Sequence, residues 1–322
     1  MSFVYRAAVR ADRQALLRLF SASFGQPPVP EAWEWKYDRN PHSFPSVLAL
    51  LGEEPVGYFG GVGTRYRGAG GDLTGVAAAD VMTHPLHRSL GRRSLFVELG
   101  LEFFRVAADA RAPFVFGFPN ERHRRTGEKR LDYRSIEPAG QWVRPLGGAG
   151  LLGRIRRRLL RPSVGDRVSP GHEALAEALH ARAGWRTDRS RATLDWRYAP
   201  HAGASYRLVE LLDRRAASRG YAAIRIVGER ALLIDLQVGD EASGDLGDLL
   251  AAAESALAGT AARWLVLRAP TWSRIARRVE AEFGFAPEPS DCHFEIRPLD
   301  PAFDADAAGR AFDYRFSDHE IF

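Results

Sequence analysis

An aromatic segment that occurs twice most constrains how this chain can fold. The two copies share the order Trp-basic-Tyr followed by Pro-His: Trp35-Lys36-Tyr37 with Pro41-His42, and Trp196-Arg197-Tyr198 with Pro200-His201. Each copy leads through an apolar run to a Gly-Tyr pair, which places Tyr58 21 residues after Tyr37 and Tyr221 23 residues after Tyr198. The shared order predicts two related halves, and chance similarity of aromatic segments is the alternative reading.

Length and composition agree with two domains of ordinary globular protein. The chain has 322 residues, of which 45% are hydrophobic and 26% charged, and these values exclude long disorder and collagen-like repeats. A single cysteine, Cys292, excludes an internal disulfide framework and a cysteine-based structural zinc site. A polar segment follows Met1, and no window approaches 18 consecutive apolar residues. We therefore expect a cytoplasmic protein without a membrane partner.

The positive charge of the chain is carried almost entirely by arginine. The net charge is +5, and Lys36 and Lys129 are its only lysines. This balance is a weak indication of an anionic ligand and does not predict DNA as a partner. Schiff-base chemistry would have two candidate residues.

Periodicity and turn signals predict the main elements. In the first half we expect strands over residues 3–9, 47–51, 56–66, 73–83, 114–118 and 133–143, with helices over 12–23, 91–108 and 120–130. In the second half we expect strands over 206–212, 221–227, 231–238, 264–268 and 293–297, with helices over 173–182, 245–258 and 272–283. Residues 300–322 are expected to form an extended tail.

The segment from Ala79 to Leu95 carries most of the chemical information. It reads ADVMTHPLHRSLGRRSL and predicts a strand, a turn and the start of a helix. A turn with Arg88 and Gly91 directly before a helix exposes unpaired N–H groups at the positive end of the helix dipole, which suits a pyrophosphate. A solvated basic helix N-terminus is the alternative reading.

This segment resembles the acyl-coenzyme A binding motif of the GCN5-related N-acetyltransferase (GNAT) superfamily, because Thr-His-Pro and then Pro-x-x-Arg-x-x-Gly precede an amphipathic helix. The Trp-x-Tyr segment in both halves, the run from Phe116 to Asn120 and the acidic tail from Ser317 to Phe322 look like tandem members of that superfamily. The resemblance implies an α+β fold of two GNAT-like domains, each a mixed, mostly antiparallel sheet flanked by helices. We expect an acyl-coenzyme A domain over 1–146, an Arg-rich linker over 147–169, and a degenerate domain with a C-terminal tail over 170–322.

The resemblance also implies roles for individual residues. The backbone of Val81 and Thr83 would contact the pantetheine arm, and an N–H of Val81 or Met82 would meet the oxyanion. The pyrophosphate would be held by the consecutive residues of the turn: Arg88, Ser89, Leu90, Gly91, Arg92, Arg93 and Ser94. Asn120 would meet the cofactor, or it would only cap the following helix.

The sequence departs from the family pattern at three places. Arg93 replaces the last small residue of the phosphate motif, and Gly127 stands where the family often has a tyrosine acid, about seven residues after Asn120. In the second half, the acidic run from Gly239 to Asp245 occupies the place of the phosphate motif and would repel a pyrophosphate. We therefore expect one cofactor site, in the first half, and a second half that completes the acceptor cleft.

Acyl transfer to an amine requires a base, and the family commonly uses a carboxylate. Asp80 is the first candidate, although a strand-end aspartate that bonds nearby backbone groups is the alternative. His84 and His123 are secondary candidates because histidine titrates near neutral pH. The free carboxylate of Phe322 is a further candidate base, since some tandem members use a C-terminal carboxylate. No ligand set for a metal is apparent, so no metal is expected.

The leading hypothesis is a transferase that moves an acetyl or other acyl group from acyl-coenzyme A to a primary amine of a small metabolite, such as an amino sugar. An acyl carrier protein is an alternative donor, because the arginines between Arg154 and Arg161 could dock an acidic partner, contact RNA or form a solvated face. Two other functions stay open: a tRNA-dependent aminoacyl or peptidyl transferase of the tandem fold, and a non-catalytic acyl-coenzyme A binding module.

Overall fold

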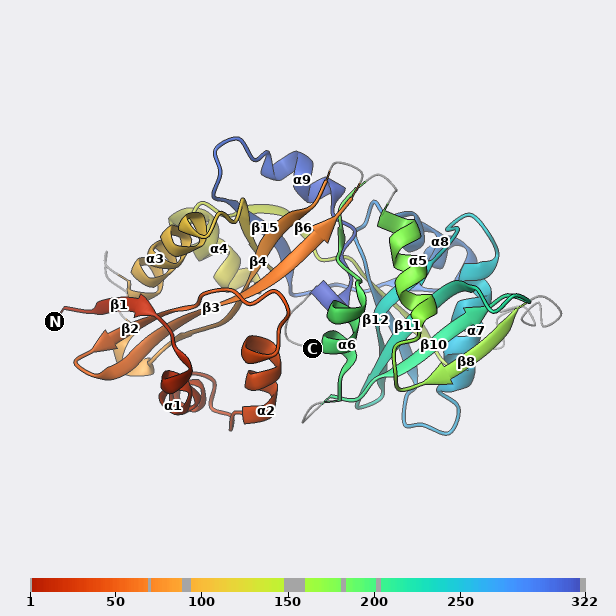
Figure 1. The fold of residues 1–322 in the computed structure, drawn as a ribbon, viewed down its shortest axis with the longest axis horizontal. Helices are drawn as coiled ribbons and strands as arrows, with labels where there is room; N and C mark the ends of the chain where they lie inside the picture. The colour runs from red at the N-terminus through yellow and green to blue at the C-terminus, as the bar shows by residue number, and fades with distance from the viewer. Residues whose placement is uncertain are drawn as a thin grey trace.

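The computed structural model describes residues 2–68, 71–88, 94–147, 160–180, 184–200 and 204–318. Two mixed sheets, each flanked by helices, form two lobes that lie side by side (Figure 1). The expected α+β fold with two similar domains is confirmed. No helix in these ranges has the length and apolar character needed to cross a membrane.

The first sheet has the strand order β1-β2-β3-β4-β5-β15-β6, and β9 pairs with the end of β3. Its strands are β1 (Val4–Ala7), β2 (Val47–Leu51), β3 (Glu54–Arg67), β4 (Leu73–Thr83), β5 (Phe114–Gly117), β6 (Arg134–Pro138), β9 (Arg186–Thr187) and β15 (His293–Pro298). Its helices are α1 (Arg13–Phe24), α2 (Pro30–Trp33), the π-helical turn η2 (Glu34–Asp38), α3 (Leu95–Asp109), α4 (Glu121–Arg130) and α9 (Ala305–Ala311), with short turns η1 (Arg10–Asp12) and η3 (Pro85–His87). Helix α3 packs its apolar face on this sheet, with Leu99 and Phe103 fully buried.

The second sheet repeats that order as β8-β10-β11-β12-β13-β7-β14. Its strands are β7 (Gln141–Pro145), β8 (Arg161–Gly165), β10 (Arg207–Leu212), β11 (Ser218–Val227), β12 (Arg230–Val238), β13 (Trp264–Arg268) and β14 (Ala286–Pro287). The helices of this lobe are α5 (Pro170–His180), α6 (Arg191–Tyr198), α7 (Asp245–Ala256) and α8 (Arg274–Phe283), and the turn η4 (Phe316–Asp318) lies near the C-terminus. In each sheet the central strand pair, β4 with β5 or β12 with β13, is parallel.

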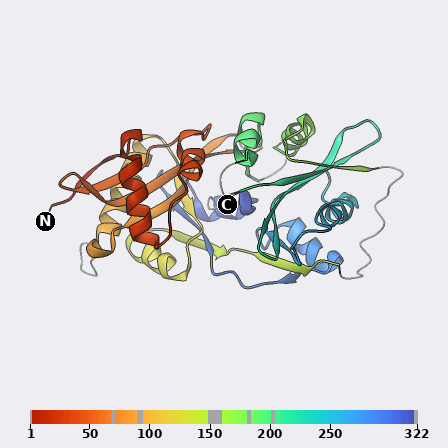
Figure 2. The same cartoon turned by 90° about the horizontal axis from the view of Figure 1, so that it is seen from below.

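The two sheets exchange one strand each. β7, from the first half of the chain, lies between β13 and β14, and β15, from the second half, lies between β5 and β6. The expectation of one strand over 133–143 is therefore wrong. The break falls at Ala139, whose N–H bonds Cys292, and Gly140, whose carbonyl accepts from Ala269, so that neighbouring residues join different sheets. Figure 2 shows the yellow-green chain passing from one lobe to the other at this point.

Two further segments differ from the expectations. Residues 161–165 of the expected linker form β8, which pairs with the edge strand β10. The expected tail contains α9, because Asp304 accepts hydrogen bonds from the N–H groups of Asp306 and Ala307 and thereby caps a helix with buried alanines. Residues 148–159, which carry most of the arginine cluster, lie outside the described residues.

The two copies of the aromatic repeat contact each other between the lobes. Trp35 on η2 and Trp196 on α6 stack with ring centroids 5.2 Å apart. Trp35 Nε1 donates to the carbonyl of Trp196 at 2.8 Å, and Trp196 Nε1 donates to the carbonyl of Trp35 at 2.7 Å. Equivalent residues thus make equivalent bonds in both directions, as a duplicated chain predicts.

This reciprocal contact gives a stability prediction. Trp35→Ala and Trp196→Ala should each lower the free energy of unfolding, by about 3–5 kcal/mol for the buried Trp35, because ring burial and stacking are lost. Urea unfolding of both single variants and the double variant should show a double cost below the sum of the single costs by at least about 0.5 kcal/mol. Trp264→Ala is the control, since Trp264 is exposed on β13. Additive costs for Trp35 and Trp196 would contradict the contact.

Candidate active site

The first sheet opens between its parallel strands β4 and β5. The two strands pair only at Val76 with Val115 and at Ala77 with Phe116. Beyond Ala77, β4 stays paired with β3 as far as Thr83, so the strands diverge like a fork. The edge of β4 that faces β5 therefore has backbone groups that β5 does not pair beyond this point.

A β-bulge at Asp80 bends β4 where the fork begins. The register to β3 shifts between Tyr58, which pairs with Met82, and Gly60, which pairs with Ala79. Asp80 has φ of +44°, a left-handed value that aspartate tolerates better than most residues. Gly60 is required opposite the bulge, because a Cβ there would overlap the hydroxyl of Tyr37 and the carbonyl of Ala79.

A cavity of about 470 Å³ lies in this fork. Small residues of β4, β5 and α4 leave room for it, and aromatic rings form much of its wall; they are Ala77, Ala78, Gly117 and Gly127, and Phe20, Phe24, Phe59, Phe96, Phe116, Phe118 and Tyr133. Its ionisable side chains are Asp80, His123, Glu295 and Asp318. The volume and the few polar groups in an apolar wall are typical of a small-molecule site.

Three residues expected from the sequence line this cavity: Asp80, Val81 and His123. The Asp80 carboxylate accepts from Lys36 Nζ at 2.9 Å and from the Tyr37 hydroxyl at 2.7 Å. Partial removal of the His123 ring from water, with the nearby cations Arg122 and Arg88, lowers the pKa of His123. Its imidazole is therefore neutral at pH 7.

Four other expected residues have local roles outside the cavity wall. The Met82 side chain is buried on the opposite face of β4, and the Thr83 carbonyl accepts from Arg88 Nε at 3.0 Å. His84 Nδ1 accepts from the N–H of Leu86 at 3.4 Å within the turn η3. Asn120 caps α4, since its Oδ1 accepts from the N–H of His123 at 3.1 Å.

The expected phosphate turn is described only at its two ends. Arg88 is exposed, and its Nη2 donates to the carbonyl of Ser23 at 2.8 Å, which connects the turn to α1. Ser94 is the residue before α3, and its side chain makes no capping bond. Ser89, Leu90, Gly91, Arg92 and Arg93 lie outside the described residues, as does Phe322.

Sequence reasoning missed two carboxylates of the cavity. Asp318, on the turn η4, accepts from the N–H of Arg315 at 2.7 Å and from the hydroxyl of Thr187, and burial raises its pKa. Glu295, on β15, is only 4% exposed, and burial together with the charge of Glu128 raises its pKa to about 8. Both come from the second half of the chain, so the cavity is built by both halves.

The second sheet contains the counterpart of Asp80 in a closed form. Asp235 on β12 accepts from the Tyr198 hydroxyl at 3.1 Å and the Tyr221 hydroxyl at 3.0 Å, which are the two tyrosines of the second repeat. Arg189 binds both carboxylate oxygens of Asp235, at 2.8 and 3.0 Å. Phe316 packs against this sheet with Ile234 and Val266. Asp235 is thus fully bonded and buried beside an apolar cluster.

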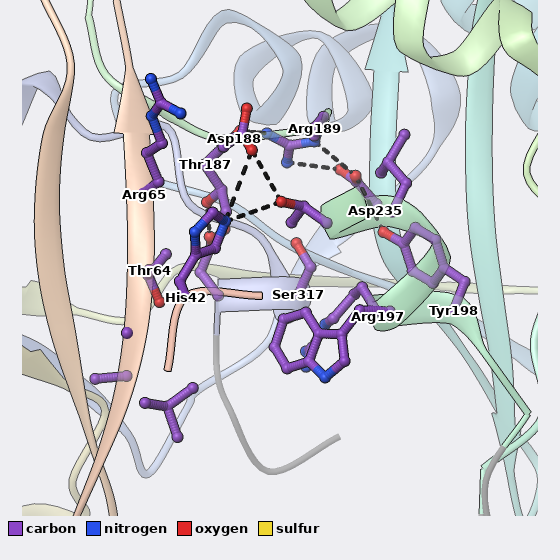
Figure 3. A pocket seen from close by; sticks show the side chains of 17 residues that line it. His42, Thr64, Arg65, Thr187, Asp188, Arg189, Arg197, Tyr198, Asp235 and Ser317 are labelled. Atoms are coloured by element: carbon purple, nitrogen blue, oxygen red, sulfur yellow. Dashed lines mark hydrogen bonds and ion pairs between the residues drawn. The ribbon is translucent and has the colours of Figure 1, made fainter. Parts of the chain in front are cut away.

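A pocket of about 40 Å³ remains between the lobes, next to Asp235 (Figure 3). His42 from the first repeat reaches the Thr193 hydroxyl at 3.0 Å, and Thr193 donates to Asp188 at 2.8 Å. Burial opposes ionisation of Asp188, but bonds from His42, Ser190 and Thr193 outweigh it and hold the pKa of Asp188 well below its usual value. The pocket has room for a water molecule or two and joins the lobes through polar bonds.

Several solved structures share this fold. A protein from Enterococcus faecalis, named as a probable N-acyltransferase, superposes with a TM-score of 0.68 at 14% identity and covers 93% of this chain and 73% of its own. A GCN5-related N-acetyltransferase from Anabaena variabilis gives 0.67 at 13% identity, with 92% and 73% covered. A tandem GNAT protein from the clavulanic acid biosynthesis pathway gives 0.61 at 16% identity, with 94% and 100% covered.

The chain has the tandem GNAT fold. At these identities the likeness establishes the fold, and it confirms the tandem GNAT-like fold that the resemblance implied. No protein-family model matches the sequence. A search of curated protein sequences also found no match. Within the described ranges, no group of three or more His, Cys, Asp or Glu side chains could hold a metal ion.

The raised pKa of Glu295 gives a prediction for stability against pH. An unfolded glutamate ionises near pH 4.3, whereas the folded carboxyl keeps its proton up to about pH 8, so the folded state binds more protons in between. Wild type should therefore lose stability relative to Glu295→Gln as the pH rises from about 5 to 8, by at most about 1.4 kcal/mol per pH unit. Urea unfolding at several pH values measures this. A difference between the two proteins that does not change with pH would contradict it.

Proposed function

We propose that this protein is an N-acyltransferase that moves an acyl group from acyl-coenzyme A to a primary amine of a small molecule. The observation that carries the proposal is the fork between β4 and β5, with its bulge at Asp80 and its cavity of about 470 Å³, in a tandem GNAT fold. Asp80 lines a cavity in the first half, whereas its counterpart Asp235 in the second half is buried and bound by Arg189. This asymmetry favours one active site per chain.

The donor fits the fork by backbone pairing and by space. Beyond Ala77, β4 can bond the amides of a pantetheine arm as one strand bonds another, along Val81 and Thr83. Ala78 and Gly117 face each other across the fork, since a Cβ on Gly117 would lie 4.0 Å from that of Ala78, and leave width for the arm. The turn from Arg88 to Ser94 and the N-terminus of α3 would hold the pyrophosphate. An acyl carrier protein offers the same arm and is the alternative donor.

The acceptor would enter among carboxylates and aromatic rings. The Asp80 carboxylate attracts a cationic amine, and a free alkyl ammonium with a pKa of about 10.4 must lose a proton before it attacks. Asp80 is the proposed base, acting directly or through water, while Lys36 and Tyr37 fix its carboxylate. The aromatic wall favours an amine with an apolar skeleton over an amino sugar.

A backbone N–H group of β4 would stabilise the negative charge that develops on the thioester oxygen. The bulge at Asp80 turns the following peptide groups away from the regular ladder, and an N–H of Val81 or Met82 is the proposed oxyanion donor. His123 lies in the same wall, and its neutral ring can donate or accept a hydrogen bond but does not add a positive charge.

Ligand-induced stabilisation tests the donor. Acetyl-coenzyme A or a longer acyl-coenzyme A at 100 times its dissociation constant should stabilise the protein by about 2.7 kcal/mol, measured as a rise in the melting temperature. Arg88→Ala should reduce this rise strongly, because a phosphate contact is lost. Arg105→Ala is the control, since Arg105 lies on α3, the helix that follows the turn, and is exposed and paired with Glu102 and Asp109.

Each result decides between functions. A rise that Arg88→Ala removes and Arg105→Ala keeps supports an acyl-coenzyme A site, and the preferred chain length begins to identify the donor. Turnover with an amine then distinguishes an enzyme from a non-catalytic binding module. A rise in melting temperature with an acylated carrier protein, but not with coenzyme A thioesters, would identify the carrier protein as the donor. No rise with either donor contradicts the proposal and leaves a tRNA-dependent transferase.

A further inference from the structure

We infer that Glu295, which the exchanged strand β15 brings from the second half of the chain, is the general acid that protonates the departing thiolate of coenzyme A. This inference rests on the proposed acyl transfer and adds a residue that belongs to neither the motif strand nor the phosphate turn. Three independent observations carry it: where β15 places the side chain, what surrounds its carboxyl group, and what stands opposite on α4.

The strand register directs Glu295 into the cavity. Glu295 pairs with Gly117 of β5 and with Ser135 of β6, so it lies at the level where the fork has opened. Successive side chains of a strand point to opposite faces, and the neighbours Phe294 and Ile296 pack in the cluster beneath α9. Glu295 consequently points to the other face, where it forms part of the cavity wall.

The carboxyl group is buried and lacks a partner that would ionise it. Its Oε2 has no hydrogen-bond partner in the described part of the chain. Arg124, the cation whose charge lowers the pKa of Glu295, already binds two other carboxylates. It bonds Glu121 at 2.8 and 2.9 Å and both oxygens of Glu128 at 2.7 Å. A carboxylate without a partner is costly to bury, so Glu295 is protonated at pH 7.

Burial and one neighbouring charge raise the pKa of Glu295, and one neighbouring charge lowers it. From α4, the negative charge of Glu128 raises the pKa of Glu295 and the positive charge of Arg124 lowers it, while burial is the largest cause of the rise to about 8. At the start of β6, burial and the charge of Glu295 raise the pKa of Tyr133 well above its usual value, so that this phenol stays neutral. From the turn η4, the buried Asp318 lies in the wall of the same cavity.

Gly127 on α4 lies next to this carboxyl. A Cβ at Gly127 would lie 3.4 Å from Glu295 Oε1 and 3.6 Å from Oε2, which is ordinary contact. The GNAT resemblance places a tyrosine acid at about this position of the helix, and here the position carries no side chain. The carboxyl of Glu295 thus reaches, from the strand, the space beside the helix position where that side chain would start.

The chemistry balances with one proton carried by Glu295. The amine nitrogen forms a bond to the thioester carbon, and the C–S bond then breaks with its electron pair on sulfur. The sulfur takes the proton of Glu295, and the proton that nitrogen loses as the amide forms returns to Glu295 through solvent. A thiol has a pKa of about 8.5, so an acid of pKa about 8 is closely matched to the leaving group.

The first test compares Glu295→Gln with Glu295→Asp in the full chain. Glutamine has the shape of the protonated acid but cannot supply its proton, so kcat should fall by about 10²-fold or more. The melting-temperature rise with acetyl-coenzyme A should stay that of wild type, which shows that the variant is folded and binds. Wild-type kcat should decline above about pH 8, where the acid ionises, and Glu295→Asp should keep such a limb at reduced kcat.

The second test varies the leaving group. With an acetyl thioester of an aryl thiol, the aryl thiolate leaves without help from an acid. The loss of kcat caused by Glu295→Gln should therefore be at least tenfold smaller with this thioester than with acetyl-coenzyme A. Asp80→Asn is the matched control, because a missing base is not replaced by a better leaving group. In Glu128→Gln the decline of kcat at alkaline pH should begin at a lower pH than in the wild type, since the charge of Glu128 raises the pKa of Glu295.

Failure of this inference is distinct from failure of the proposed function. Turnover by Glu295→Gln within threefold of wild type, or an equal defect with both thioesters, overturns the role of Glu295 and leaves acyl transfer intact. Absence of turnover and of any donor-induced rise in the wild type overturns both.

Discussion

The reciprocal bond between Trp35 and Trp196 is the contact on which the arrangement of the two halves depends. Each indole stacks on the other and donates to the backbone of the other segment, so the two copies of the repeat are joined as equivalent partners. The exchange of β7 and β15 extends the same relation into both sheets. Each sheet therefore contains a strand from the other half, which joins the two lobes through backbone hydrogen bonds.

The same tyrosine–aspartate contact occurs in both halves, but its surroundings differ. In both, a tyrosine of the repeat donates to an aspartate near the fork, as Tyr37 does to Asp80 and Tyr198 to Asp235. In the second half Arg189 binds the buried aspartate, and Phe316 packs in the apolar cluster of the same sheet. In the first half the fork stays open, and the exchanged strand adds Glu295 to its wall. A duplicated unit thereby yields one stabilising sheet and one candidate site.

Much of this could be predicted from the sequence, and the failures have physical causes. The repeat predicted two similar lobes, and the strand, turn and helix from Ala79 onward were predicted because their periodicity is local. The pairing partners of a strand are not local: residues 293–297 were predicted as a strand, but their sequence does not state which sheet the strand joins. Glu295, between two apolar residues of that strand, therefore gave no signal of burial in a cavity of the other half. Likewise, β8 was not predicted, because it lies in a segment whose glycines and arginines are typical of a linker.

The central claim is that both halves build one acyl-transfer site in the fork of the first sheet. The most direct measurement is photolabelling with an acyl-coenzyme A that carries a photoreactive acyl chain, followed by mass spectrometry of the labelled peptides. The account predicts labels on β4 or β5 near Ala78 and Gly117, and on β15 at Glu295, with competition by acetyl-coenzyme A. Labels confined to β12 and β13, or labels that acetyl-coenzyme A does not suppress, would contradict it.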